Sequence, residues 1–192
     1  MARKLRTILV TGFEPFGPIR VNPSETIARA FDGRRIRGAR IVGRVLPVSL
    51  GRIGPAVAAA LRETRPDAVV ALGVARNALS LRIERRAVNR ARFEIPDNDG
   101  ALAATRLETA GRPMRRATLP LDRIMRAARR SRTPVRYSDD AGAYLCNAAF
   151  YAFLGARTPC AFLHVPMHDA LRVRRTLERV LASCAGGRAP SG

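Results

Sequence analysis

Short apolar stretches alternate along the chain with longer stretches in which apolar residues recur every three or four positions. The stretches Arg6–Thr11, Ala68–Gly73 and Ala161–Val165 are short and largely apolar, as buried strands are. Helical spacing predicts helices over residues 23–31, 51–64, 119–130, 141–154 and 171–184. Because strands and helices follow one another in turn, we predict an α/β fold, a three-layer α/β/α sandwich with a mixed, largely parallel central sheet.

Residues that favour helix ends and turns set the limits of several elements. Asn22 is expected to cap the first helix, with Pro23 at its first position and Glu25 at its third, similar to a capping box. Asp32-Gly33 ends that helix. Residues 95–100, Ile-Pro-Asp-Asn-Asp-Gly, predict a strong turn.

The remaining segments are consistent with a single domain. Residues 36–47 predict one or two strands, and the alternation of Leu79, Leu81 and Ile83 predicts another within a less regular stretch. We find no internal repeat, linker or low-complexity block. One domain over residues 1–192 is therefore expected, with residues 185–192 as a loose tail.

Composition places the chain among ordinary globular proteins. It has 192 residues, of which 47% are hydrophobic and 26% charged, enough to build a core. No apolar stretch approaches the ~18 residues of a membrane-spanning helix. The basic N-terminus is followed only by the short apolar stretch Thr7–Val10, which is too short for a signal peptide. We therefore expect a cytoplasmic protein.

The charge balance leaves a second class of function open. Lys and Arg total 35 against 15 Asp and Glu, giving a net charge of +20. Such a charge favours a polyanionic partner. However, Lys4 is the single lysine and the arginines are spread along the chain, as a GC-rich coding bias would also produce. Aromatic residues make up 5% and Trp is absent, so stacking platforms for nucleic acid are scarce. Nucleic-acid binding remains the less favoured alternative.

The cysteines and histidines do not form a pattern typical of disulfide frameworks or metal sites. Cys146, Cys160 and Cys184 are irregularly spaced, and the chain has two histidines, His164 and His168. We expect no metal and no cofactor. Cys160 and Cys184 are expected to pack as small apolar groups.

Three residues with reactive side chains follow apolar segments, where an α/β sheet collects its active site. Cys146 lies early in a predicted helix, and a helix N-terminus and a nearby imidazolium both favour the thiolate that acts as a nucleophile. His164, at the end of a strand, is the candidate base, and Glu84 is the candidate carboxylate that orients it. Composition alone favours the alternative that Cys146 and His164 are ordinary buried groups.

A set of segments, taken together and in order, carries a family resemblance. They are residues 8–17 (ILVTGFEPFG), Asn22-Pro23-Ser24, Leu46-Pro47-Val48, Gly73, residues 84–89 (ERRAVN), Ile95-Pro96-Asp97-Asn98, residues 138–142 (SDDAG), Tyr144-Leu145-Cys146-Asn147 with Tyr151, and residues 162–166 (FLHVP). With these segments the chain resembles the pyroglutamyl peptidase I family, or pyrrolidone-carboxylate peptidases, over roughly residues 6–168.

The resemblance implies an activity and a set of site residues. The family consists of cysteine peptidases that remove N-terminal pyroglutamate (5-oxoproline) from peptides and commonly form homo-oligomers, often tetramers. Its Cys-His-Glu triad matches Cys146, His164 and Glu84, and Asp97 matches a position near the site that supports the histidine. The positions that line the lactam pocket match Phe13, Phe16, Asn22, Ile95, Tyr144 and Leu145.

The sequence departs from the family pattern at two places. Arg76-Asn77-Ala78 replaces a Gly-Gly-Arg element near the substrate, which puts side chains where glycines would allow positive φ. Glu94 replaces an arginine near the catalytic centre. A divergent or weakly active relative with an altered substrate is therefore an alternative, because function depends on the site rather than on the fold.

Overall fold

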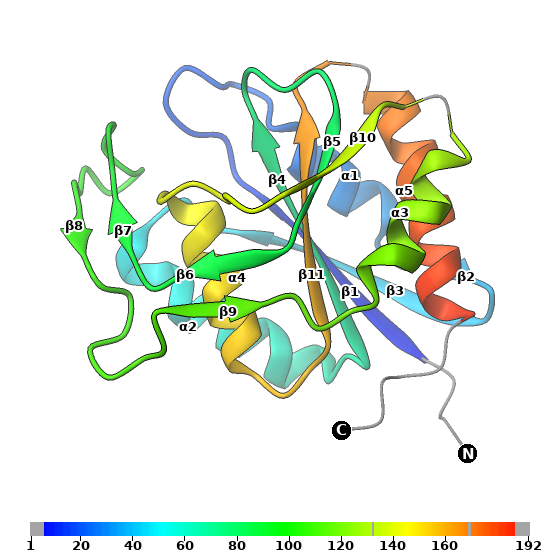
Figure 1. Cartoon of the computed structure of the whole chain (residues 1–192), viewed down its shortest axis with the longest axis horizontal. Helices are drawn as coiled ribbons and strands as arrows, with labels where there is room; N and C mark the ends of the chain where they lie inside the picture. The colour runs from blue at the N-terminus through cyan, green and yellow to red at the C-terminus, as the bar shows by residue number, and fades with distance from the viewer. Residues whose placement is uncertain (1–5, 132, 169, 187–192) are drawn as a thin grey trace.

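The computed structural model describes residues 6–131, 133–168 and 170–186. Its centre is a seven-stranded sheet with the order β10-β5-β11-β4-β1-β3-β2 (Figure 1). Four central strands, β3, β1, β4 and β11, run parallel, β2 and β5 are antiparallel to their neighbours β3 and β11, and β10 is parallel to β5. Their bounds are β1 Thr7–Phe13, β2 Arg35–Ile36, β3 Ala39–Leu46, β4 Ala68–Ala75, β5 Leu81–Glu84, β10 Val135–Ser138 and β11 Cys160–Pro166.

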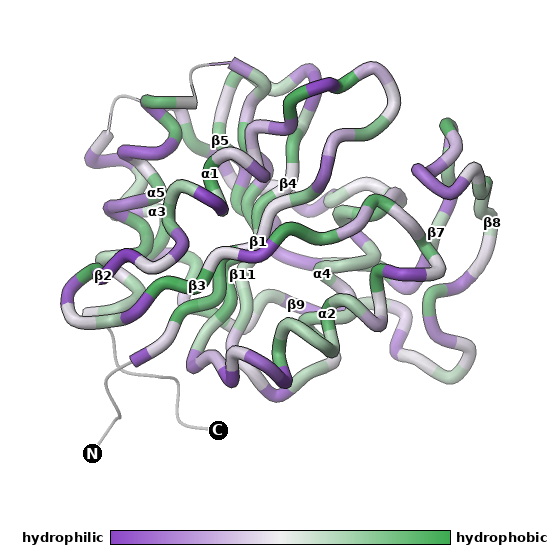
Figure 2. Tube along the Cα trace, turned by 180° about the vertical axis from the view of Figure 1, so that it is seen from behind, coloured by the Kyte–Doolittle hydropathy of each residue, from purple (hydrophilic) through white to green (hydrophobic). Residues whose placement is uncertain are grey.

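Helices cover both faces of this sheet, which confirms the predicted three-layer α/β/α sandwich. One face is covered by α1 (Pro23–Phe31), α3 (Leu121–Arg129) and α5 (Ala170–Ala185), and the other by α2 (Leu50–Thr64) and α4 (Leu145–Gly155) (Figure 1). Each face has its own apolar cluster, because successive residues of a strand point to opposite sides. Figure 2 shows hydrophobic residues gathered along the central strands and hydrophilic ones more often on outer turns.

Two small antiparallel pairs follow β5 and lie beside α4 (Figure 1). β6 (Arg86–Val88) pairs with β9 (Met114–Arg116), and β7 (Ala91–Arg92) pairs with β8 (Ala104–Thr105). The buried Asn147 of α4 accepts a hydrogen bond from the Val88 N–H at 2.9 Å and donates to the Val88 and Arg90 carbonyls at 2.9 and 2.8 Å. This amide fixes the start of α4 against the segment that leaves β5.

The ends of α1 and α4 show where local signals were sufficient and where they were not. Asn22 caps α1 as predicted, since its side-chain oxygen accepts the Ser24 N–H at 3.1 Å. Glu25 does not complete a capping box, because it pairs with Arg29 one turn later. α4 begins at Leu145 rather than near residue 141, because residues 140–142 form a turn with Gly142 at φ +79°.

No helix within the described residues is both long and apolar enough to cross a membrane.

Candidate active site

The parallel strands β4 and β11 and the antiparallel strand β5 bring the candidate residues together. β11 pairs with β4 so that His164 lies beside Gly73, and β5 pairs with β11 so that Glu84 lies beside Phe162. Phe162 and Ala71, two positions before His164 and Gly73 in their strands, belong to the apolar cluster shared with α4. Because strand side chains alternate, Glu84 and His164 point to this same face, toward the start of α4.

His164 and Glu84 form a buried hydrogen-bonded pair. The Nδ1 atom of His164 lies 2.8 Å from Oε1 of Glu84, although the two residues are 80 positions apart in the chain. Glu84 is fully buried and His164 is 6% exposed. The second carboxylate oxygen of Glu84 has no hydrogen-bond partner within the described residues. The Glu84 carboxylate therefore binds the imidazole through Nδ1, and the other ring nitrogen, Nε2, is available to a second partner.

Cys146 is the second residue of α4 and lies against the sheet at Gly73. A Cβ atom added to Gly73 would be 2.6 Å from the Cys146 sulfur and 2.8 Å from the Phe162 ring, so only glycine admits the sulfur here. Tyr144, which precedes α4, makes no side-chain capping hydrogen bond. The first N–H groups of the helix are therefore available to an anion beside Cys146.

The interactions of His164 with the Cys146 sulfur and the Glu84 carboxylate keep the imidazole protonated to high pH. Burial is the largest effect on His164 and lowers its pKa. The charge of Cys146 and a hydrogen bond to it, together with the Glu84 hydrogen bond and charge, act in the opposite direction and raise the pKa to about 9. Since Nδ1 is bonded to Glu84, Nε2 is the nitrogen that faces the sulfur.

We expect the His164 pKa to fall when the sulfur is removed. In Cys146→Ser, burial still lowers the His164 pKa, but the largest interaction that raises it is lost. The His164 pKa of the variant should therefore lie below the value of about 9 in the wild type. Imidazole proton NMR against pH measures the titration of His164 in both proteins. Identical His164 titration in the two proteins would show that the sulfur and ring do not interact.

A narrow slot beside Cys146 contains most of the predicted lactam-binding residues. It has about 10 Å³ of space, roughly that of one water molecule. It is lined by Phe13, Phe16, Asn22, Val48, Val74, Tyr144, Leu145 and Cys146. The amide of Asn22 is already engaged, since it caps α1 and donates to the Glu14 carbonyl at 3.1 Å. Val48 and Val74 were not predicted, although Val74 directly follows Gly73 at the end of a parallel strand, where ligands gather.

A wider, open pocket of about 700 Å³ adjoins the slot and also contains Cys146 and His164. Ile95 lines this pocket rather than the slot, together with Phe16 and Tyr144. Its charged lining residues are Arg76, Arg90, Arg92, Glu94 and Asp140. Arg76 and Glu94 stood out in the sequence, whereas Arg90, between β6 and β7, and Arg92, the last residue of β7, were not predicted.

The turn at residues 76–78 does not require the glycines that it lacks. None of these residues has a positive φ, and the Ala78 N–H donates to the Ala75 carbonyl at 3.0 Å. Ala78 is buried while Arg76 is exposed at the pocket. The departure therefore changes the side chains at the pocket and leaves the backbone unstrained.

Contrary to the prediction that Asp97 supports His164, the partners of Asp97 are backbone groups of a turn and a helix start. Its carboxylate accepts N–H groups of Leu50 at 2.8 Å, Asp99 at 3.0 Å and Ala101 at 2.9 Å. The Tyr144 hydroxyl donates to the neighbouring Pro96 carbonyl at 3.0 Å. Asp97 thus fixes the turn that Tyr144 contacts. Burial, followed by the Asp97 and Cys146 charges, raises the Tyr144 pKa to about 12.

The other cysteines and the second histidine lie away from this cluster. Cys160 and Cys184 are buried, and burial raises the pKa of both thiols, to about 11 for Cys184. Both belong to the apolar clusters on their faces, as expected for packing groups. His168 is exposed.

Comparison with known proteins gives consistent matches. The sequence profile of the family described as pyroglutamyl peptidase matches residues 6–174. A pyrrolidone-carboxylate peptidase of Pyrococcus furiosus is 39% identical over 166 residues, covering 83% of this chain and 80% of the relative. One from Cupriavidus pinatubonensis is 38% identical over 170 residues, covering 84% and 79%. The solved pyrrolidone carboxyl peptidase of Thermococcus litoralis superposes with a TM-score of 0.89 at 32% identity, covering 93% of both chains.

Proposed function

The chain belongs to the pyroglutamyl peptidase family, and on that premise we propose that it removes N-terminal pyroglutamate from peptides through a thioester formed on Cys146. As a member of this family, the protein is a cysteine-type hydrolase. The observation that carries the proposed site is the Glu84–His164 hydrogen bond, with Cys146 and His164 lining one pocket beside the narrow slot.

In the first half of the reaction, the Cys146 sulfur attacks the carbonyl carbon of the pyroglutamyl residue. The thiol proton is already held on Nε2 of His164, whose pKa is raised to about 9, and a carbon–sulfur bond forms. The uncapped N–H groups at the start of α4 hold the oxyanion that develops on the carbonyl oxygen. The bond to the next residue then breaks, and its nitrogen takes the proton from His164 and leaves as an amine.

In the second half, water attacks the thioester and gives its proton to His164. The carbon–sulfur bond breaks, pyroglutamate leaves, and the proton stays on His164 beside the sulfur. Glu84 keeps the imidazole in one orientation and stabilises the imidazolium that forms in both halves. Its complete burial makes this interaction stronger than it would be in water.

The slot selects a compact, uncharged ring. Phe13, Phe16 and Val74 give it apolar walls, which suit a lactam and disfavour the charged amine of an ordinary N-terminus. The slot as it stands has room for about one water molecule, so the lactam enters by displacing a wall. Phe16 is the wall that moves, because it lies half-buried on a loop next to Gly17, whose φ is +53°.

The wider pocket receives the peptide that follows pyroglutamate. Its volume of about 700 Å³ is larger than one lactam requires, and the pocket begins at Cys146, where the scissile bond must lie.

The proposal also includes assembly into a homo-oligomer, a tetramer as is common in the family. It includes a cytoplasmic location as well, where the Cys146 thiol stays reduced.

We predict strong discrimination between a pyroglutamyl and a prolyl substrate carrying the same fluorogenic leaving group. The two rings have the same size, but prolyl brings a charged amine into an apolar slot, so its kcat/KM should be at least ~100-fold lower. Hydrolysis is followed by fluorescence in reducing buffer.

The same assay separates the alternatives. No turnover of the pyroglutamyl substrate by folded, reduced protein at any pH would favour a divergent relative. Salt-sensitive binding of DNA or RNA that survives Cys146→Ala would favour the nucleic-acid alternative.

A further inference from the structure

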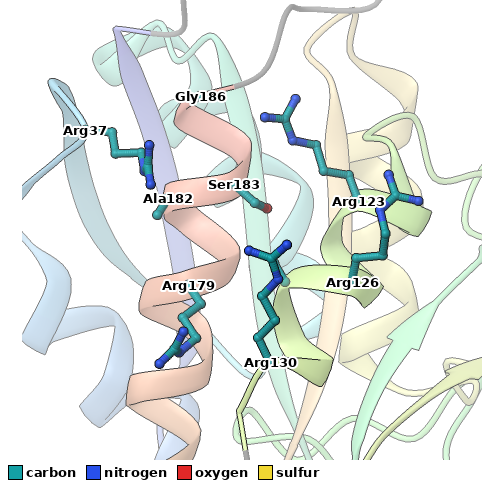
Figure 3. Close-up of a pocket in the computed structure, with 9 residues that line it drawn as sticks. Arg37, Arg123, Arg126, Arg130, Arg179, Ala182, Ser183 and Gly186 are labelled. Carbon is teal, nitrogen blue, oxygen red and sulfur yellow. The ribbon is translucent and has the colours of Figure 1, made fainter.

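An arginine-lined groove runs between α3 and α5, on the sheet face opposite to Cys146. It has a volume of about 500 Å³. Figure 3 shows arginine side chains from both helices and from the β2–β3 turn around it. We refer to it as the arginine groove. Its lining residues are Arg37, Arg123, Arg126, Ala127, Arg130, Arg179, Ala182, Ser183 and Gly186.

The groove exists because the facing positions of the two helices carry small residues. α3 and α5 bury their large apolar side chains, such as Ile124 and Leu177, against the sheet. Between the outer parts of the helices lie Ala182, Ser183 and Gly186. On α3, arginines at positions 123, 126 and 130 share one face, since residues three and four apart are neighbours on a helix.

The arginines of the groove have no compensating charge. None of the five forms an ion pair or a side-chain hydrogen bond among the residues that the structure describes, and no carboxylate lines the groove. The single carboxylates of the two helices are engaged elsewhere: Asp122 accepts the Tyr137 hydroxyl at 2.6 Å, and Glu178 pairs with Arg34 at 2.6 Å. Arginines outside the groove do pair with carboxylates, as Arg29, Arg52 and Arg115 show.

Two of the arginines converge from distant parts of the chain. Arg37 and Gly38 form the tight turn between β2 and β3, and Arg37 has a φ of +49°, which residues other than glycine rarely adopt. A Cβ atom on Gly186 would lie 3.7 Å from an Arg123 guanidinium nitrogen and 3.8 Å from Cδ of Arg37. The turn and the two helices thus direct positive charge to one place.

The composition of the groove defines the chemistry of its ligand. Guanidinium groups bind phosphate oxygens in a planar, bidentate manner. Arg123 and Arg130 are the two ends of the arginine row along α3. At the helical rise, their Cα atoms are separated by roughly 10 Å along the helix axis, so a single phosphate group cannot contact the whole row. No aromatic or large apolar residue lines the groove, so nucleobases have nothing on which to stack.

We propose that the arginine groove binds a condensed phosphate, a chain of at least three linked phosphate groups. Isothermal titration calorimetry with tripolyphosphate at physiological ionic strength tests this. The pair Arg126→Glu and Arg130→Glu should weaken binding at least ~10-fold, since each removes charge-assisted contacts. Gly186→Glu should also weaken binding, because its carboxylate would compete with phosphate for Arg123 and Arg37 while every arginine is kept. The side chain can be accommodated, since a Cβ atom at this position meets no atom closer than 3.4 Å.

A matched control separates the groove from the overall charge of the protein. Arg129→Glu with Arg175→Glu changes the net charge by the same amount at exposed positions of α3 and α5 that lie outside the groove, and should alter affinity by less than ~2-fold. Circular dichroism confirms that each variant is folded. Equal losses in both pairs, no binding of tripolyphosphate, or equally tight binding of orthophosphate would overturn the proposal. So would tighter binding of a single-stranded oligonucleotide with as many phosphates.

Discussion

Replacing Cys146 with serine is expected to reduce kcat on a pyroglutamyl substrate at least ~1000-fold, because the hydroxyl is a far weaker nucleophile than the sulfur and its proton is lost much less readily. Cys146 is half-buried and serine is nearly isosteric, so the free energy of unfolding should change by less than ~1 kcal/mol. Turnover and the thermal midpoint, measured on one preparation, separate the two effects.

Cys184 offers the matched thiol control. It is buried in α5, on the opposite face of the sheet from Cys146. Cys184→Ala should leave turnover near the wild-type value and lower the thermal midpoint, since it removes buried volume. If Cys146→Ser retains most of its activity while Cys184→Ala loses it, the nucleophile has been assigned to the wrong sulfur.

The second large effect is expected from Glu84→Gln, which keeps the size of the side chain and removes its charge. The neutral amide stabilises the imidazolium of His164 less well than the carboxylate that now lies 2.8 Å away. We expect kcat/KM to fall by ~100-fold to ~10,000-fold. The alkaline limb of the pH profile should also move to lower pH, because Glu84 is one of the groups that raise the His164 pKa.

The same pKa shift affects stability, with a defined sign. The His164 pKa is raised from 6.5 to about 9, so the folded protein holds this proton more tightly than the unfolded chain does. The stability that this contributes is complete below about pH 6.5 and is lost as the pH rises toward 9. Denaturant unfolding between these pH values should show a smaller decline in Glu84→Gln than in the wild type.

Glu63→Gln is the control for removing a carboxylate. Glu63 is exposed near the end of α2 and lines neither the pocket nor the slot, so its replacement should change neither kcat/KM nor the pH profile. A Glu84→Gln variant that matches Glu63→Gln in both measurements would remove Glu84 from the mechanism and leave its hydrogen bond a structural one.

Sequence alone determined the layers of this protein because its elements carry local, periodic signals. β4 is apolar throughout and β11 is apolar except for His164, as strands buried on both faces are, and the helices alternate with them. The Asn22 cap was also predictable, since it depends on contacts within a few residues. Local signals failed at α4, whose start is delayed by a turn that no apolar periodicity marks.

Only the tertiary structure decided how the reactive groups meet. Sequence proposed Glu84, Cys146 and His164, but strand pairing across the sheet sets the 2.8 Å contact of the carboxylate and imidazole. Asp97 illustrates the limit, because its three backbone partners lie in a turn and a helix start whose approach no local pattern encodes. The uncompensated charge of the arginine groove was likewise hidden, because charge along a chain does not specify which guanidiniums lack carboxylates nearby in space.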